Sequence, residues 1–299
     1  MYDVIIIGGG PAGLSAGIYA GRARLKTVIV EKLMPGGQAA VTDFIENYPG
    51  FSDGIPGSEL VVKMQEQVEK FGCEIKYEDV TAVNVKEKKV KTPSGEYYGK
   101  ALILAAGADP RNLDVPGNDT FLGRGISFCA TCDGALFSGK TVAVVGGGDS
   151  AVKEAIFLTK FAAKVFVIHR RHALRAEKII QEKAFQNSKM QFMWDTVVTE
   201  INGDQKVTSI TVKHIKTGDK SEIPVDGVFI YIGRKPNTLL FEVEKVNGYI
   251  VTDEDMRTSV EGVFAAGDCR KKAHRQVATA VGDGAAAAMS AEEYIAQLE

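Results

Sequence analysis

The chain has 299 residues, of which 45% are hydrophobic and 25% are charged, and its formal net charge is −2. This length suits two domains, each large enough to bury a core of its own. Because there is no basic excess, the charge balance argues against nucleic acid as a main partner.

The N-terminal segment holds a short apolar run that ends in a cluster of glycines, IIIGGGPAG. A signal peptide would carry Lys or Arg where Asp3 stands, and a membrane span would need about 18 apolar residues without interruption. We therefore interpret the run as a buried strand and a glycine-rich turn. No other segment is apolar enough to span a bilayer, which predicts a soluble, cytoplasmic protein with no membrane partner.

The first chemical motif is Gly8-x-Gly10-x-x-Gly13, which follows an apolar strand at 4–7 and opens a helix of small residues. In this context the glycines allow a tight turn, close approach to a pyrophosphate and close packing of the helix. The helix N-terminus would then face the phosphates. A second strand at 27–30 leads to Glu31, which would accept hydrogen bonds from an unphosphorylated ribose, as in FAD or NAD.

Further along, Cys129 and Cys132 stand two residues apart in the segment CATCD. The pair could be half of a zinc site, a structural disulfide or a redox pair. A structural zinc ion needs four ligands, and only Cys73, Cys269 and four scattered histidines remain to complete a site. Structural disulfides are rare in intracellular proteins, so a redox pair is favoured. We expect Cys73 and Cys269 to be buried as small apolar residues.

A second phosphate-binding motif, Gly146-x-Gly148-x-x-Ala151, follows a strand at 142–145 and opens another helix. The next strand, at 165–168, leads to His169, and the spacing of 23 residues from the first glycine equals that between Gly8 and Glu31. No acid stands there. The segment is basic instead and holds His169, Arg170, Arg171 and Arg175. Arginines at this place indicate a clamp for a 2′-phosphate, hence NADP(H), rather than a solvated basic loop.

Near the C-terminus a short strand at 263–266 ends at Gly267-Asp268 and precedes an alanine-rich helix. Asp268 suits a ribityl or phosphate-adjacent contact, and the alternative is a plain helix cap. The order of motifs predicts an α/β fold of two Rossmann-like dinucleotide-binding domains, with the NADPH domain inserted into the FAD domain. We expect the FAD domain at 1–113 and 242–299 and the NADPH domain, with the CxxC, at 114–241. Proline-containing segments at 109–119 and 232–242 are the expected crossings.

Along essentially its full length the chain resembles the low-molecular-weight thioredoxin reductases of bacteria and archaea. The matching stretches include IIIGGGPAGLSA, ENYPGF, CATCDGALF, VVGGGDSAVKEA, HRRHALRA, YIGRKPNT and VFAAGDCR. The CxxC lies in the NADPH half, just before its phosphate loop. That placement distinguishes this family from the larger disulfide reductases, whose redox pair lies in the FAD half.

The resemblance implies an NADPH-dependent flavoprotein that reduces thioredoxin or a thioredoxin-like protein, as a homodimer whose domains rotate between half-reactions. Cys132 would face the flavin, Cys129 would attack the partner's disulfide and Asp133 would shuttle the proton. Segments 112–117 and 237–243 would be the hinges. The FAD ligands would be Gly8, Gly10, Gly13, Glu31, Gln38, Asn47 and Asp268, with Gln276 and Val277 beside the isoalloxazine. The NADPH ligands would be Gly146, Gly148, Ser150, His169, Arg170, Arg171 and Arg175.

Three other functions share parts of this pattern. A ferredoxin–NADP reductase of the same build lacks the CxxC, so Cys129 and Cys132 count against it. A dithiol oxidase that passes electrons to oxygen keeps the CxxC but is expected to lose the NADPH clamp, which this chain has. A flavin-bound redox sensor without turnover is disfavoured by intact sites for two cofactors.

Overall fold

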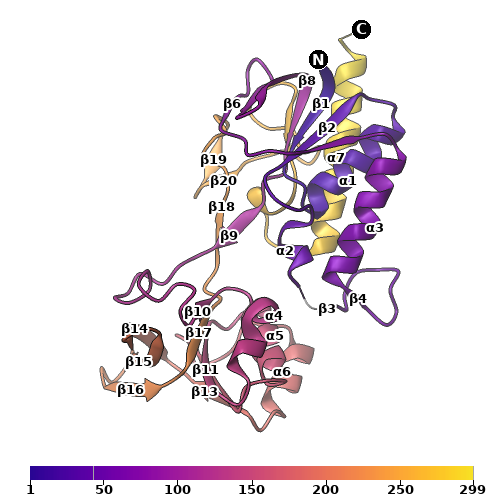
Figure 1. The fold of residues 1–299 in the computed structure, drawn as a ribbon. Coiled ribbons are helices and arrows are strands. Elements are labelled where there is room, and N and C mark those ends of the chain that lie inside the picture. The colour runs from indigo at the N-terminus through magenta and orange to yellow at the C-terminus, as the bar shows by residue number, and fades with distance from the viewer. Residues whose placement is uncertain (43, 299) are drawn as a thin grey trace. The chain divides into compact units, whose positions relative to one another are not determined.

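The computed structural model describes residues 1–42 and 44–298, and the chain folds into two compact units (Figure 1). The first unit comprises Met1–Asp109 and Lys235–Glu299, and the inserted unit comprises Pro110–Arg234. The chain passes between them at β9 (Ala108–Pro110) and β18 (Arg234–Pro236), which pair with one another. The predicted α/β architecture, with one Rossmann-like unit inserted into another, is confirmed.

The first unit is built on a mixed sheet whose parallel part carries the N-terminal strand at its centre. The order is β5-β2-β1-β8, with β21 on the far side of β8. These strands are β1 (Tyr2–Ile7), β2 (Thr27–Glu31), β5 (Glu74–Tyr77), β8 (Gly95–Leu104) and β21 (Val263–Ala265). β6 (Ala82–Asn84) and β7 (Lys89–Thr92) extend β8 as an antiparallel meander.

Both faces of this parallel sheet are covered, which explains why its strands are apolar without alternation. Helices α1 (Pro11–Arg22), α3 (Gly57–Lys70) and α7 (Val277–Ala296) pack against the face that carries Val4 and Ile6 (Figure 1). A Cβ at Gly284 of α7 would overlap the backbone of α1 at Ala12, so the two helices pack at backbone contact. This packing places the N-termini of α1 and α7 in one region of the unit.

The short elements of the first unit complete its loops. Helix α2 (Gly37–Ala40) follows β2, and β3 (Phe44–Ile45) pairs with β4 (Ile55–Pro56). The pair β19 (Lys245–Val246) and β20 (Tyr249–Ile250) precedes β21, and the 3-10 turn η2 (Gly267–Cys269) follows it.

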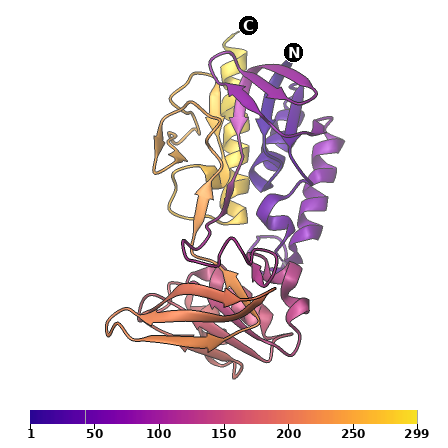
Figure 2. The same cartoon turned by 60° about the vertical axis from the view of Figure 1, so that its left-hand side comes forward.

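The inserted unit has a fully parallel sheet in the order β10-β17-β11-β12-β13. The strands are β10 (Ile126–Ser127), β11 (Thr141–Val145), β12 (Lys164–Ile168), β13 (Met190–Met193) and β17 (Gly227–Ile230). Its helices are α4 (Ala130–Asp133), the 3-10 turn η1 (Gly134–Phe137), α5 (Asp149–Leu158) and α6 (Lys178–Phe185). An antiparallel sheet of β14 (Thr196–Gly203), β15 (Val207–His214) and β16 (Lys220–Pro224) joins it (Figure 2).

Candidate active site

In the first unit, the glycine loop between β1 and α1 has the geometry of a phosphate cradle. Gly8 has a φ of +106°, and a Cβ there would overlap the carbonyl of Ala105. A Cβ at Gly13 would overlap the carbonyl oxygen of Gly8, so α1 packs tightly onto the loop. By contrast, a Cβ at Gly10 would meet nothing within 4 Å. The open side of Gly10 at the start of a helix leaves room for a pyrophosphate.

Glu31, the last residue of β2, lies directly against this loop. Its Oε2 accepts a hydrogen bond from the N–H of Gly9 at 2.6 Å, and its Oε1 accepts from the N–H of Leu33 at 3.0 Å. Each carboxylate oxygen retains a second lone pair that a ribose hydroxyl can use. The N–H of Gly36 donates to the carbonyl of Gly9 at 2.7 Å, so the segment before α2 also borders the loop.

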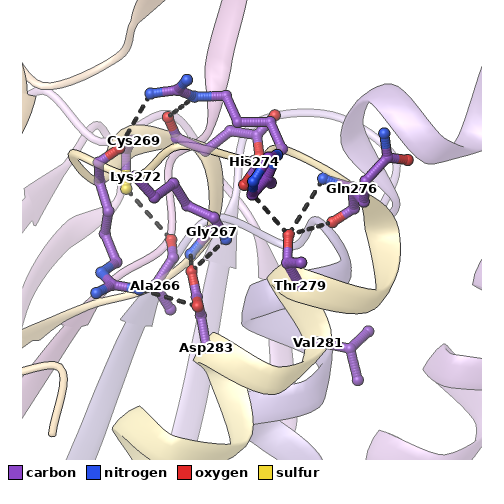
Figure 3. Close-up of polar contacts among 12 residues, drawn as sticks. Ala266, Gly267, Cys269, Lys272, His274, Gln276, Thr279, Val281 and Asp283 are labelled. Carbon is purple, nitrogen blue, oxygen red and sulfur yellow. Dashed lines mark hydrogen bonds and ion pairs between the residues drawn. The ribbon is translucent and has the colours of Figure 1, made fainter. Parts of the chain in front are cut away.

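A hydrogen bond connects Asn47 and Gln276, which lie in distant segments of the sequence and are both predicted to contact FAD. The side-chain amide of Asn47 donates to Oε1 of Gln276 at 3.2 Å. Gln276 is the N-cap of α7, and its N–H donates to the hydroxyl of Thr279 at 3.2 Å (Figure 3). Val277 follows as the first residue of α7 and is half-buried. Gln38 lies exposed on α2, and its backbone carbonyl accepts a hydrogen bond from the hydroxyl of Thr42 at 2.9 Å.

Asp268 lies half-buried in η2, directly after β21. A second carboxylate, Asp283, holds this turn and was not predicted from the sequence. Asp283 on α7 accepts from the N–H of Gly267 at 2.9 Å (Figure 3). It also pairs with Arg270 at 2.9 Å and with Lys272 at 2.7 Å. The three charged side chains are only 10% to 12% exposed. The one signal in the sequence was a lone carboxylate within VGDGAAAA, an otherwise uncharged stretch of the C-terminal helix.

In the inserted unit, the second glycine loop has the same design. Gly146 has a φ of +149°, and a Cβ there would overlap the carbonyl of Tyr231. Gly148, the N-cap of α5, has nothing within 4 Å of a Cβ position. Ser150 lies exposed in the first turn of α5. The N–H of Arg175 donates to the carbonyl of Gly147 at 2.6 Å, which folds the basic segment back onto the loop.

His169 is the buried member of the basic segment and packs on the glycine loop. It is 4% exposed, and a Cβ at Gly147 would overlap its ring. Burial, followed by the positive charges of Arg175, Arg171 and Arg170, lowers the pKa of His169, so the ring is neutral at neutral pH. Its Nε2 is buried without a hydrogen-bond partner among the described residues. The three arginines themselves are exposed. A buried ring nitrogen without a partner, beside exposed cations and an open glycine loop, fits a phosphorylated nucleotide.

Cys129 and Cys132 form a disulfide in the inserted unit, across the single turn of α4. Cys129 is the N-cap, and its Sγ accepts from the N–H of Cys132 at 3.1 Å. Asp133 ends the turn, is half-buried and donates its N–H to the carbonyl of Cys129 at 3.1 Å. Cys132 is exposed and Cys129 is half-buried. The arrangement can open and close a disulfide within one short helical turn.

Sequence reasoning missed two hydroxyl residues that hold this turn. The hydroxyl of Ser127, at the end of β10, accepts from the N–H of Cys129 at 3.0 Å and donates to its carbonyl at 3.2 Å. The hydroxyl oxygen of Tyr231 accepts from the N–H of Ala130 at 3.0 Å. Ser127 is two residues from Cys129 and could have been suspected, whereas Tyr231 is more than a hundred residues away.

The other two cysteines, Cys73 and Cys269, are buried, as expected, and neither forms a disulfide. Burial raises the pKa of the Cys73 thiol to about 12 and that of the Cys269 thiol to about 11, so neither is a thiolate at neutral pH. The Cys269 thiol donates to the carbonyl of Leu104 at 3.3 Å.

Within residues 1–42 and 44–298, no group of three or more His, Cys, Asp and Glu side chains could hold a metal ion. No helix in the same residues is long and apolar enough to cross a membrane.

Comparison with known proteins agrees with this geometry. The sequence profile of the family described as pyridine nucleotide-disulphide oxidoreductase matches residues 2–284. The thioredoxin reductase of Bacillus subtilis is 50% identical over 305 aligned residues, which cover 100% of this chain and 96% of that protein.

Two solved structures are similar over nearly the whole chain. Lactococcus lactis thioredoxin reductase in its FR conformation is 45% identical, covers 99% of this chain and 100% of its own, and has a TM-score of 0.97. The thioredoxin reductase of Streptococcus pyogenes is 48% identical, covers 99% of both chains and has a TM-score of 0.65. The chain therefore belongs to the pyridine nucleotide-disulphide oxidoreductase family and, within it, to the low-molecular-weight thioredoxin reductases.

Proposed function

We propose that this protein reduces the disulfide of thioredoxin or a thioredoxin-like protein, with NADPH as the electron source and FAD as the carrier. The Cys129–Cys132 disulfide is the observation that carries the proposal, because it lies in the same unit as a phosphate loop bordered by His169 and arginines. A redox disulfide in the unit that holds the basic phosphate loop is the placement that distinguishes the low-molecular-weight thioredoxin reductases from the larger disulfide reductases.

The first unit binds FAD, which when bound accepts a hydride from a nicotinamide and passes two electrons to a disulfide. The glycine loop of Gly8, Gly10 and Gly13 holds the pyrophosphate, and Glu31 holds the adenosine ribose. Asp268 holds the ribityl or phosphate end of the cofactor. The fit of the cradle supports these roles, as does the hydrogen bond that ties Asn47 to Gln276 at the N-terminus of α7. Gln38 and Val277 complete the proposed set.

The inserted unit binds NADPH. Gly146, Gly148 and Ser150 hold the pyrophosphate at the N-terminus of α5. Arg170, Arg171 and Arg175 neutralise the 2′-phosphate, since a planar guanidinium binds a phosphate through paired hydrogen bonds. His169, kept neutral by its lowered pKa, offers the buried Nε2 as a hydrogen-bonding group to the adenosine end.

The cysteine pair performs the thiol–disulfide exchange. Two electrons and two protons convert the Cys129–Cys132 disulfide into two thiols. The Cys129 thiolate attacks one sulfur of the partner's disulfide, which forms a mixed disulfide and releases one partner thiolate. The Cys132 thiolate then attacks Sγ of Cys129, reforms the internal disulfide and releases the second partner thiolate. Asp133, at the end of α4, exchanges the protons that these thiolates take up and lose.

Three further features belong to the same proposal. The two units rotate about the crossings between half-reactions, because one disulfide must reach both a cofactor and a protein. Solved relatives of similar identity match this chain with very different TM-scores, which supports a family captured in more than one conformation. The protein is a cytoplasmic homodimer.

Anaerobic oxidation of NADPH by the purified yellow protein tests the function, with and without thioredoxin from the same organism and beside Cys132→Ser. Turnover that requires thioredoxin and Cys132 is expected. Cys73→Ser is the matched control, since this buried thiol takes no part, and it should turn over normally. Flavin that is reduced by NADPH without thioredoxin-dependent turnover would overturn the partner. Flavin that is reduced by ferredoxin and not by NADPH would overturn the electron source.

A further inference from the structure

The redox turn α4 is anchored by a residue from the opposite end of the inserted unit's sequence. Ala130, its first residue, is fully buried, and its N–H donates to the hydroxyl oxygen of Tyr231 at 3.0 Å. We propose that Tyr231 is a positioning residue for the Cys129–Cys132 couple, which holds α4 in place when the disulfide is open. The proposal deepens the function proposed above and rests on its assignment of these cysteines as the redox pair.

The fold places Tyr231 where it contacts both the redox turn and the phosphate loop. Tyr231 directly follows β17, which pairs with β10 on one side and β11 on the other. Its N–H donates to the carbonyl of Val145 at 2.8 Å, and its carbonyl borders Gly146 so closely that a Cβ would not fit there. The backbone of Tyr231 is therefore fixed beside the nucleotide loop, while its side chain reaches the first amide of α4.

The anchor matters most in the reduced enzyme. In the oxidised enzyme the disulfide itself closes the turn, with the Cα atoms of Cys129 and Cys132 5.3 Å apart. Once the disulfide is reduced, the packing of the buried Ala130 and the hydrogen bonds of the turn keep the two sulfurs at opposite ends of it. A four-residue turn has too little helical stability of its own to do this. The contacts of Ala130 with Tyr231 and of Cys129 with Ser127 supply that restraint.

The surroundings of the phenol suit a fixed, neutral acceptor. Burial, followed by the negative charge of Glu154, raises the pKa of Tyr231 above its ordinary value, and the charge of Asp133 acts in the same direction. The hydroxyl therefore stays protonated throughout the working pH range. Tyrosine is needed rather than phenylalanine because the ring alone would fill the space but leave the buried N–H of Ala130 without its acceptor, which is costly.

The test compares Tyr231→Phe with wild type as NADPH-reduced holoenzymes under anaerobic conditions. Amide hydrogen exchange is resolved for the segment that contains α4, and steady-state turnover is measured with thioredoxin. We expect Ala130 to exchange about fivefold faster or more, and kcat to fall by a similar factor, because one buried hydrogen bond is lost. The KM for NADPH and the rate of flavin reduction should stay within about twofold, since the backbone of residue 231, which hydrogen-bonds Val145 and borders Gly146, is unchanged in the variant.

Tyr97→Phe is the matched control, because the Tyr97 hydroxyl donates to Glu78 at 2.9 Å in the other unit. It should leave exchange in α4 and turnover unchanged. Equal exchange and equal kcat in Tyr231→Phe and wild type would overturn the proposal. So would faster exchange spread evenly over β11 and β12, which would mean a general loss of structure. If Tyr231→Phe does not fold, the same exchange measurement on reduced wild type still tests the proposal. An Ala130 amide that exchanges there as fast as in an unstructured peptide would overturn the proposal. The amide exchange is measured without thioredoxin. A failure of the proposed function, seen in the turnover assay, is therefore distinguished from a failure of the proposal about Tyr231.

Discussion

Asn47 and Gln276 are joined by a hydrogen bond of 3.2 Å between their side chains, although 229 positions separate them in the sequence. The bond ties the loop between β3 and β4 to the N-cap of α7. Both residues belong to the proposed FAD site. The hydrogen bond therefore links two segments of that site that are far apart in the sequence.

Replacement of Asn47 by alanine should weaken FAD binding. The variant loses one side-chain hydrogen bond in the cradle, so we expect the dissociation constant for FAD to rise about three- to tenfold. Fluorescence of FAD released on serial dilution measures it. Asn84→Ala is the control, because Asn84 caps an exposed turn of the same unit through the N–H groups of Lys86 and Glu87. Equal affinities in the two variants would contradict a role for Asn47.

Asp283→Asn should be strongly destabilising. Its carboxylate pairs with Arg270 and Lys272 at sites about one-tenth exposed, and the change leaves both cations buried without a counter-charge. The expected loss is about 3 kcal/mol in the free energy of unfolding, measured by urea denaturation. Asp255→Asn breaks an exposed pair with Arg257 and should cost about 0.5 kcal/mol or less. Equal losses in both variants would show that the buried network adds nothing.

The preference for NADPH over NADH should depend on Arg170. Replacement of this exposed cation by alanine removes a charge that we assign to the 2′-phosphate, so the KM for NADPH should rise about tenfold. NADH lacks that phosphate, and its KM should stay within about twofold. Initial rates of flavin reduction with each nucleotide measure the split. A parallel rise in both KM values would assign Arg170 to another part of the site.

His169 should make the protein less stable as the pH falls. Burial and the neighbouring arginines lower its folded-state pKa below the ordinary value of 6.5, so the unfolded chain takes up the proton more readily. The stability that the neutral ring contributes is fully present above pH 6.5 and is lost as the pH falls through 6.5 toward the folded-state pKa. Urea unfolding between pH 7.5 and pH 5.5 should therefore show a smaller loss for His169→Gln than for wild type. Equal losses of stability in His169→Gln and wild type over this pH range would contradict the prediction.

A covalent crosslink between the two units should separate the half-reactions. If the units rotate about the predicted hinges at 112–117 and 237–243, a fixed orientation supports either flavin reduction by NADPH or reduction of thioredoxin, and not both. Stopped-flow absorbance of the flavin and thioredoxin-dependent turnover measure the two steps on one crosslinked sample. Reversal of the crosslink should restore both. Full turnover in the crosslinked enzyme would rule out the rotation.

Several features of this protein could be predicted from the sequence because their causes are local. Gly8 and Gly146 stand in turns that require glycine, and each follows an apolar strand and opens a helix, so the two Rossmann-like units follow from short segments. The spacing of Cys129 and Cys132 is likewise local, since one helical turn brings the sulfurs into bonding range.

Which side chains hold these segments in place depends on contacts between residues that are far apart in the sequence. Gly267 meets Asp283 because α7 packs back along α1, and Ala130 meets Tyr231 because β17 inserts between β10 and β11. Neither pairing leaves a periodic or spaced pattern in the sequence, since each depends on the order of strands in a sheet or on the packing of helices. Local residue chemistry determined the two nucleotide loops and the redox pair, whereas long-range packing determined the groups that hold them in place.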